Sequence, residues 1–218
     1  MNKQEIIKKT EKFVKDKLYG EGTGHDWWHI LRVWQVAKKI GKEEGADLFV
    51  VELASLLHDI ADWKFQDGGD DSIGAMIAKE WLEKFNIDSK TISHICDIVV
   101  GISFKGAEVK DKLYSIEGKV AQDADRLDAM GAMGISRCFA YGGSKGRPIY
   151  NPDIKPKMHK SFEEYKKNNS SSINHFYEKL LLLKDRMNTK TGKAIAKERH
   201  KFMESYLDRF FKEWEGKS

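Results

Sequence analysis

Cysteine and proline are scarce in this sequence of 218 residues, and each scarcity excludes a class of protein. The two cysteines, Cys96 and Cys138, lie far apart and form no CxxC pair, so a disulfide scaffold and a cysteine-based zinc site are excluded. This cysteine usage fits a reducing cytoplasm. The chain contains only three prolines and so has few helix interruptions, which favours an all-helical fold.

The sequence also lacks a long apolar run and a concentration of charge of one sign. No stretch approaches the roughly 20 apolar residues of a membrane span. The start of the chain is too charged for the apolar region of a signal peptide, so we expect a cytoplasmic protein with no membrane partner. The net charge of +4 arises without a dense basic tract, and no long nucleic acid is expected as a partner.

Apolar residues recur at helical spacing along most of the chain. The segment from Ala46 to Leu57 is unusually apolar and predicts a core helix that ends at His58 and Asp59. Residues 66–71 have the composition of a turn, and residues 141–158 hold all three prolines and predict an irregular loop. Further helices are expected over 6–18, 30–40, 73–85, 90–102, 119–130, 162–187 and 189–215, the last capped by Thr189 or Thr191. The sequence therefore predicts an all-α fold, one domain of about eight to ten helices with one long irregular loop.

His58 and Asp59 stand directly after the most hydrophobic stretch of the chain. An unpaired charge in such surroundings costs several kcal/mol, so another group must compensate it. A bound metal ion is one such group, and a buried hydrogen bond between the two side chains is the alternative. The dipeptide alone does not choose between them.

Two further groups of metal-ligating residues accompany this dipeptide. His25 and His29 lie one helical turn apart upstream, and VAQDADRLD places three aspartates in an otherwise apolar helix downstream. A set drawn from these segments offers two imidazoles and two carboxylates: His29, His58, Asp59 and Asp125. This mixture suits Mn²⁺, Fe²⁺, Co²⁺, Ni²⁺ or Mg²⁺ better than a closed structural zinc site.

The ordered pattern H…HD…D resembles the HD-domain superfamily of metal-dependent phosphohydrolases. The segments GHDWWHILRV, LLHDIADWK, VVGISFKG and QDADRLDAMGAMGISR are similar to the YedJ/YpgQ branch of that superfamily. The tail segment SSINHFYEKLLLLKDRMNTKTGKAIAKERHKFM is similar too, so the likeness covers nearly the whole chain. The resemblance implies one HD-type domain over residues 1–218, with the HD core at about 20–140 and a C-terminal helical extension at about 160–215.

Position by position, the resemblance assigns the metal ligands to His29, His58, Asp59 and Asp125. Asp125 is chosen because a small residue precedes it and a basic and an apolar residue follow it, as in the family. Asp123 and Asp128 remain alternatives for this ligand, and otherwise Asp128 faces the substrate. In related enzymes an acidic residue near Asp62 handles the attacking water, so Asp62 is either a general base or an acid on the surface.

Several other side chains are candidates for binding the substrate, each with a solvated or structural role as the alternative. They are His25, Arg32, Lys64, Lys105, Asp128, His175 and Lys179. A lysine or arginine supplies positive charge to a polyphosphate.

The resemblance implies a small phosphorylated substrate, in particular a nucleotide. The leading reaction is release of pyrophosphate from (deoxy)nucleoside triphosphates by attack of metal-activated water on phosphorus. Cleavage of phosphomonoesters or cyclic nucleotides is the nearest alternative, and a non-catalytic metal or nucleotide sensor is an alternative of another class. A homo-oligomer is compatible with all of these.

Overall fold

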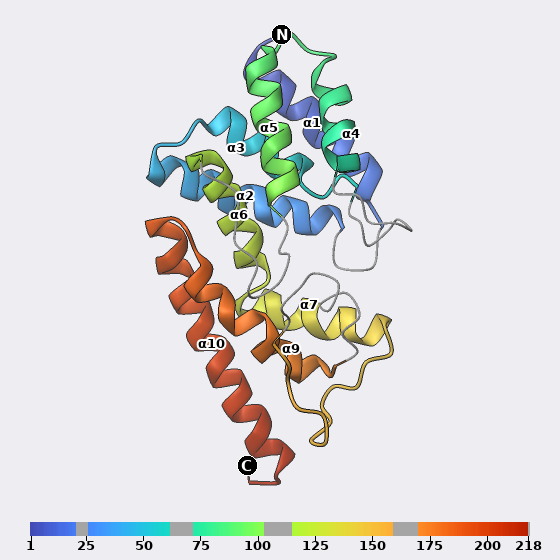
Figure 1. Cartoon of the computed structure of the whole chain (residues 1–218), viewed down its shortest axis with the longest axis vertical. Coiled ribbons are helices and arrows are strands. Elements are labelled where there is room, and N and C mark those ends of the chain that lie inside the picture. The colour runs from blue at the N-terminus through green and yellow to red at the C-terminus, as the bar shows by residue number, and fades with distance from the viewer. Residues whose placement is uncertain (21–25, 62–71, 103–114, 159–169, 218) are drawn as a thin grey trace. The chain divides into compact units, whose positions relative to one another are not determined.

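The structure, a computed structural model, describes residues 1–20, 26–61, 72–102, 115–158 and 170–217 (Figure 1). Among these residues the regular elements are all helical, which confirms the predicted all-α fold. The α-helices are α1 (Lys3–Leu18), α2 (Trp27–Glu44), α3 (Leu48–Leu57), α4 (Ser72–Leu82), α5 (Ser89–Gly101), α6 (Ile116–Asp128), α7 (Gly131–Ser144), α9 (Ser172–Glu178) and α10 (Lys190–Trp214), and η2 (Leu180–Arg186) is a 3₁₀ helix. The turn predicted at 66–71 lies outside the described residues.

The described chain packs as two compact units, and the boundary between them falls within α6. The first unit extends to Asp125, and the second begins at Arg126. The predicted single domain stays a prediction, because compactness alone does not decide whether two units fold separately.

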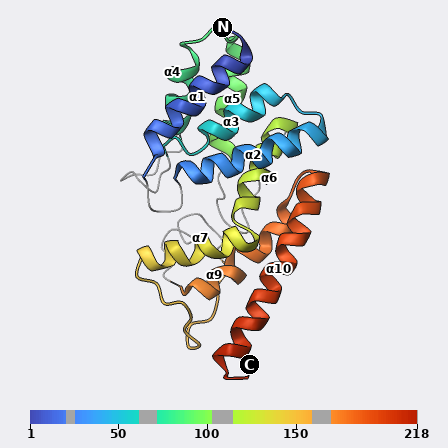
Figure 2. The ribbon, with the colours of Figure 1, turned by 180° about the vertical axis from the view of Figure 1, so that it is seen from behind.

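Helix α3 is the centre of the first unit. It packs against α1, α2 and α5, and the two opposite views show α5 on one side of it and α1 on the other (Figures 1 and 2). Leu53, Leu56 and Leu57 are completely buried, and burial of each such side chain stabilises the fold by about 1.5–3 kcal/mol. Contact on several sides explains why this segment is apolar all round, as the sequence predicted.

The second unit is built from α7, α9, η2 and α10, with the long helix α10 packed against both α7 and η2. Phe176 of α9 is completely buried. Its ring stacks on Tyr206 of α10 with centroids 5.9 Å apart and lies 6.1 Å from the ring of Phe139 of α7. These aromatic contacts join three helices in one core.

The prediction of one long helix over 162–187 is wrong in its described part. Helix α9 ends at Glu178, and Lys179 has non-helical dihedral angles. The following leucines form a 3₁₀ helix, whose three-residue period places Leu180 and Leu183 on one face. Both of these leucines are buried, so packing favours the tighter helix.

The last helix and the proline-rich loop agree with the sequence more closely. Thr189 caps α10, and its hydroxyl accepts a hydrogen bond of 2.9 Å from the amide of Gly192. The irregular segment begins at Lys145 rather than Tyr141, because α7 continues to Ser144. This loop is tied to α9, since the side-chain amide of Asn174 donates to the carbonyl of Ile154 at 2.7 Å.

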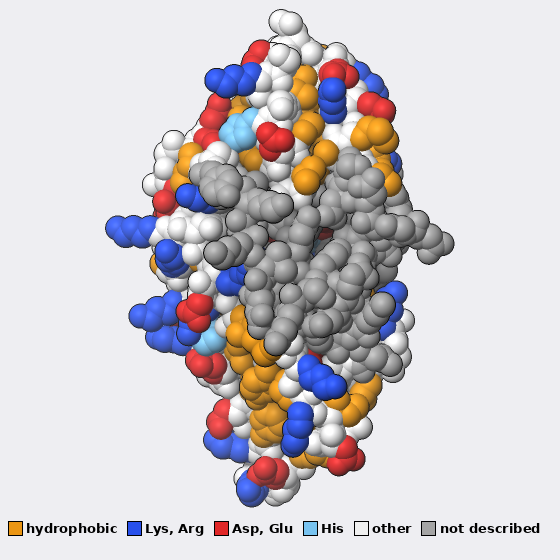
Figure 3. Space-filling model, viewed as in Figure 1, with side chains coloured by type: hydrophobic (Ala, Val, Ile, Leu, Met, Phe, Trp, Pro, Cys, Tyr) orange, Lys and Arg blue, Asp and Glu red, His pale blue; other side chains and the backbone are white. Residues whose placement is uncertain are grey.

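The surface carries charges of both signs. On the face shown in Figure 3, the Lys and Arg side chains of the described residues are interspersed with Asp and Glu. No helix within the described ranges has the length and hydropathy needed to cross a membrane.

Gly131, the first residue of α7, has a backbone conformation that favours glycine. Its φ angle is +67°, in the left-handed region. A β-carbon at this position would lie 3.1 Å from Cγ and 3.2 Å from Cβ of Arg199. The backbone therefore turns here with the stem of Arg199 directly against it.

We predict that Gly131→Ala destabilises the protein more than Gly146→Ala does. Gly146 has a similar φ of +65° but nothing within 4 Å of the added carbon, so it is the matched control for backbone strain. Gly146→Ala should cost about 1–2 kcal/mol, and Gly131→Ala should add the displacement of Arg199. Urea denaturation followed by circular dichroism measures both. Equal losses of stability would show that the contact with Arg199 has no energetic weight.

Candidate metal centre

His29 lies at the start of α2, in its first turn. Asp26 is the N-cap of this helix, and its carboxylate accepts a hydrogen bond of 3.0 Å from the backbone amide of His29. The cap satisfies an amide that would otherwise lack a partner at the helix terminus. The side chain of His29 is completely buried, so the local sequence fixes the backbone of a buried imidazole.

His58 directly follows the last turn of α3, and one ring nitrogen is fixed by the backbone. Its Nδ1 atom lies 2.8 Å from the carbonyl oxygen of Ser55. A carbonyl only accepts hydrogen bonds, so Nδ1 must be the donor in this contact. In the neutral ring this leaves the lone pair on Nε2, which is the nitrogen that a metal ion requires.

The four predicted ligands converge in the first unit. The Nε2 atoms of His29 and His58 lie 3.2 Å apart. Oδ2 of Asp59 lies 3.3 Å from Nε2 of His29 and 3.6 Å from Nε2 of His58. Oδ1 of Asp125 lies 3.5 Å and 3.8 Å from the same two nitrogens. Three helices far apart in the sequence thus bring nitrogen and oxygen ligands together.

This arrangement fits a divalent metal ion. With metal–ligand bonds of about 2.1 Å, neighbouring octahedral ligands lie about 3.0 Å apart and opposite ones about 4.2 Å apart. The five nitrogen–nitrogen and nitrogen–oxygen distances fall between 3.2 and 3.8 Å, within that interval. Ligand atoms of His29, His58 and Asp125 all lie within 4.8 Å of one another. Two imidazoles with carboxylates suit Mn²⁺, Fe²⁺, Co²⁺ or Ni²⁺, and Mg²⁺ is compatible with the oxygen ligands.

The two sides of this centre differ in exposure. The side chains of His29 and His58 are at most 1% exposed, whereas those of Asp59 and Asp125 are 12% and 25% exposed. The imidazoles therefore form a closed side, and the carboxylates lie on the side that water reaches. A site open on one side retains positions for water and substrate, as catalytic metal sites do.

The three aspartates of α6 have different surroundings. Asp123 is completely buried, and it lies two residues from Asp125, on a different face of the helix. Asp128 is also buried, and its Oδ2 accepts a hydrogen bond of 2.9 Å from Arg137. Of these three side chains, Asp125 is the one that the structure groups with the two histidines.

The other predicted site residues lie in different places. His25, Asp62, Lys64 and Lys105 lie outside the described residues. Arg32 is half-buried in α2. His175 and Lys179 belong to the second unit, at α9 and its C-terminal end, and Asp128 belongs to that unit too.

Sequence reasoning missed two groups that hold the histidines in place. One is the carboxylate of Asp26, whose position directly before an apolar periodic segment is a recognisable N-cap signal. The other is the carbonyl of Ser55, which no side-chain pattern reveals because every residue carries a carbonyl. Both groups act on the ligands through hydrogen bonds to the backbone or the ring.

The cysteines agree with a centre made of nitrogen and oxygen ligands. Burial raises the pKa of the Cys138 thiol to about 12, and burial also raises the pKa of Cys96. Each thiol is therefore protonated near neutral pH when no metal is bound.

Known proteins are similar to this chain over most of its length. Residues 27–130 match the HD domain. The protein YpgQ of Bacillus subtilis is 39% identical over 206 residues, which cover 94% of this chain and 91% of YpgQ.

Solved structures are similar over both units. An HD-superfamily hydrolase from Bacillus thuringiensis has a TM-score of 0.76 and 42% identity, with coverage of 98% of this chain and 99% of the other. Bacillus subtilis YpgQ, solved in complex with ADP, has a TM-score of 0.75 and 37% identity, with coverage of 97% and 100%.

These similarities confirm the resemblance that the sequence motifs predicted, and the HD match contains all four proposed ligands. The chain therefore belongs to the HD-domain superfamily of metal-dependent phosphohydrolases, in the branch that includes YpgQ.

Proposed function

We propose that this protein hydrolyses nucleotides, with release of pyrophosphate from (deoxy)nucleoside triphosphates as its leading reaction. The observation that carries the proposal is the convergence of His29, His58, Asp59 and Asp125 on one position that is closed on the imidazole side and reached by water on the carboxylate side. The ADP complex of YpgQ supports a nucleotide as the substrate class.

In this proposal the four side chains hold a divalent ion, with the buried imidazoles on one side of the site and the more exposed carboxylates on the other. The buried rings of His29 and His58 keep water away from one side, and the hydrogen bond to Ser55 keeps the His58 ring in its ligand tautomer. A divalent ion held by these residues would lower the pKa of a bound water and would neutralise charge that develops on the phosphoryl oxygens. Asp59 and Asp125 face the side from which a phosphate approaches.

Asp62 is the proposed general base, on the strength of its position in the sequence. It follows His58 by four residues in the segment LLHDIADWK. A carboxylate here would take a proton from the attacking water. The proposed substrate contacts are the cationic, imidazole and acidic side chains predicted above: His25, Arg32, Lys64, Lys105, Asp128, His175 and Lys179.

Which P–O bond is broken depends on where the phosphate chain lies relative to the ion. The same ligands serve a pyrophosphohydrolase, a phosphomonoesterase and a cyclic-nucleotide phosphodiesterase, because each uses activated water and charge neutralisation. A sensor would use the ligands to bind a nucleotide without turnover. The products of a substrate screen separate these four functions.

We predict that His58→Ala, Asp59→Ala and Asp125→Ala each weaken Mn²⁺ binding strongly. Loss of a partner of a metal ligand costs about 10- to 100-fold in affinity, and loss of a ligand itself should cost at least as much. Isothermal titration calorimetry of metal-stripped protein measures the dissociation constant. His94→Ala is the control, because His94 lies in the same unit but is hydrogen-bonded to Ser115. Full metal content in any ligand variant would remove that residue from the centre.

We predict that the Mn²⁺-loaded protein converts nucleoside triphosphates to monophosphates and pyrophosphate, and that a chelator abolishes this activity. The screen covers nucleoside tri-, di- and monophosphates, cyclic nucleotides and generic phosphoesters, with products identified by chromatography. Inorganic phosphate from monophosphates, or ring opening of a cyclic nucleotide, would favour the alternative hydrolases. Nucleotide binding without turnover would favour the sensor.

We predict that Asp62→Asn lowers kcat by about 10²- to 10⁴-fold, the usual contribution of a general base. Mn²⁺ affinity should change little, because Asp62 is not one of the proposed ligands. Asp208→Asn, an exposed position on α10, is the matched control. Unchanged kcat in Asp62→Asn would show that this residue is a surface acid.

A further inference from the structure

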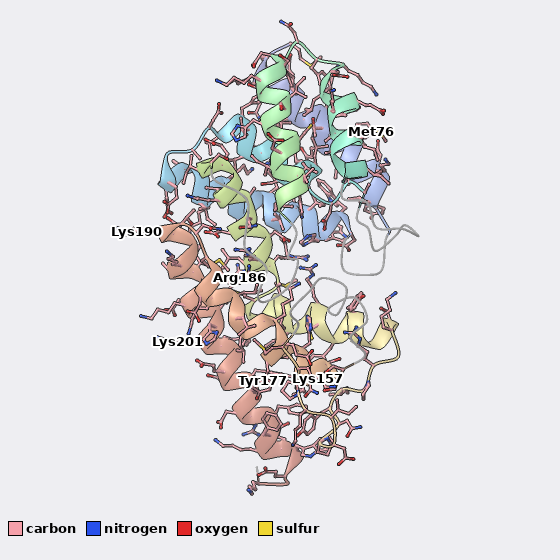
Figure 4. All side chains as sticks on the ribbon, in the orientation of Figure 1. Met76, Lys157, Tyr177, Arg186, Lys190 and Lys201 are labelled. Carbon is pink, nitrogen blue, oxygen red and sulfur yellow. The ribbon has the colours of Figure 1, made fainter. Side chains whose placement is uncertain are left out.

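Three arginines of the second unit make hydrogen bonds at the last turn of α6, one from within the turn and two from other helices. The side chain of Arg126 donates to the carbonyl of Arg186 at the end of η2, the residue labelled in Figure 4. Arg199 of α10 donates to the carbonyl of Leu127. Arg137 of α7 donates to the carboxylate of Asp128 at 2.9 Å. Contacts from η2, α7 and α10 thus meet at one helix end.

This helix end is also the part of α6 that carries Asp125. The last four carbonyl groups of an α-helix have no intrahelical partner, and helix ends fray for this reason. Asp125 is the fourth residue from the end of α6, which terminates at Asp128. Fraying of the last turn would move the carboxylate that lies 3.5 Å from Nε2 of His29.

Backbone amides donate two hydrogen bonds to the carbonyl groups of this last turn. The amide of Ala129 donates to the carbonyl of Arg126 at 3.1 Å, and the amide of Met130 donates to the carbonyl of Leu127 at 3.0 Å. Arg199 supplies a second donor to that same Leu127 carbonyl. Its positive charge also faces the negative end of the helix dipole, which is a favourable interaction.

The absence of a side chain at Gly131 leaves space for Arg199 to reach the Leu127 carbonyl. Its Cβ and Cγ atoms lie within the space that a side chain at Gly131 would occupy. Burial lowers the pKa of Arg199, and the charge of nearby Asp128 opposes that shift. Arg199 is therefore a partly desolvated cation at the helix end, near the Asp128 carboxylate that Arg137 binds.

We propose that Arg199, assisted by Arg137, is a positioning residue for the metal centre. By closing the last turn of α6 it holds the Asp125 carboxylate in place for the ion. The inference rests on the assignment of Asp125 as a ligand under the proposed function. It adds that residues of the second unit set the metal affinity of the first without touching the ion.

The test compares Arg199→Met with Arg199→Lys and with Arg209→Met. Methionine keeps the aliphatic stem against Gly131 but removes the donor, and lysine restores a donor. Arg209→Met is the matched control, because Arg209 is an exposed residue of the same helix and pairs with Glu213. The readouts are the Mn²⁺ dissociation constant of metal-stripped protein and the hydrogen-exchange rates of the amides at 125–129.

Arg199→Met should weaken Mn²⁺ binding about 5- to 10-fold, somewhat less than the loss of a direct partner of a ligand. Exchange at 125–129 should accelerate, while Arg199→Lys recovers part of both properties and Arg209→Met changes neither. Unchanged Mn²⁺ affinity in Arg199→Met would overturn the inference. If Arg199→Met fails to fold, Arg137→Met is used in the same comparison, with the same expected loss and the same outcome against the inference.

A double-mutant cycle with Asp125→Asn separates positioning from a general loss of stability. If Arg199 acts through Asp125, then Arg199→Met causes no further loss of Mn²⁺ affinity in the Asp125→Asn background. Independent losses that multiply would overturn the inference. If Asp125→Asn alone leaves the affinity unchanged, the ligand assignment of the proposed function is wrong and the inference falls with it. If Asp125→Asn weakens binding but Arg199→Met does not, only the inference fails.

Discussion

The 3.2 Å approach of the Nε2 atoms of His29 and His58 is the contact on which the rest of the site depends. Nε2 of His58 presents a lone pair, because Nδ1 of the same ring donates to Ser55. The carboxylate oxygens of Asp59 and Asp125 lie close to both nitrogens. Such a concentration of acceptors in a buried place is unfavourable without positive charge. A proton between the two rings can form only one hydrogen bond, whereas a divalent cation can bind the ring nitrogens and the carboxylate oxygens together.

Three of the proposed ligands share a second property, which is that each lies at the end of a helix. His29 is in the first turn of α2, His58 follows α3, and Asp125 is in the last turn of α6. Helix ends from different parts of the chain can converge on a point without their backbones colliding. They also fray more readily than helix interiors, so each needs a group that closes it. Asp26 has this role at the start of α2, and the arginine contacts have it at the end of α6.

Much of the fold could be predicted from sequence, because burial imposes a periodic pattern on each helix. The apolar segment that became α3 is the clearest case, since helices on several of its sides bury most of its residues. The pattern failed at Leu180–Arg186, where consecutive leucines satisfy both the α-helical and the 3₁₀ period. Only contact with the rest of the second unit selects between these two helices.

The site shows a similar division between what residue types reveal and what geometry adds. The histidines and aspartates could be picked out because buried imidazoles and carboxylates need compensation, and the family pattern then favoured Asp125. Asp123, Asp125 and Asp128 have the same chemistry, so only the direction of each side chain separates the residue beside the histidines from the one bound by Arg137. The carbonyl of Ser55 carries no signal in the sequence at all.

The boundary between the two compact units falls within α6. The HD match ends at residue 130, one residue before the glycine that admits Arg199, yet the similarity to YpgQ covers 94% of this chain. Because α6 continues without interruption from the proposed ligand Asp125 into the second unit, the two units share one helix. A change that loosens the helix end in the second unit therefore reaches the metal centre through the backbone.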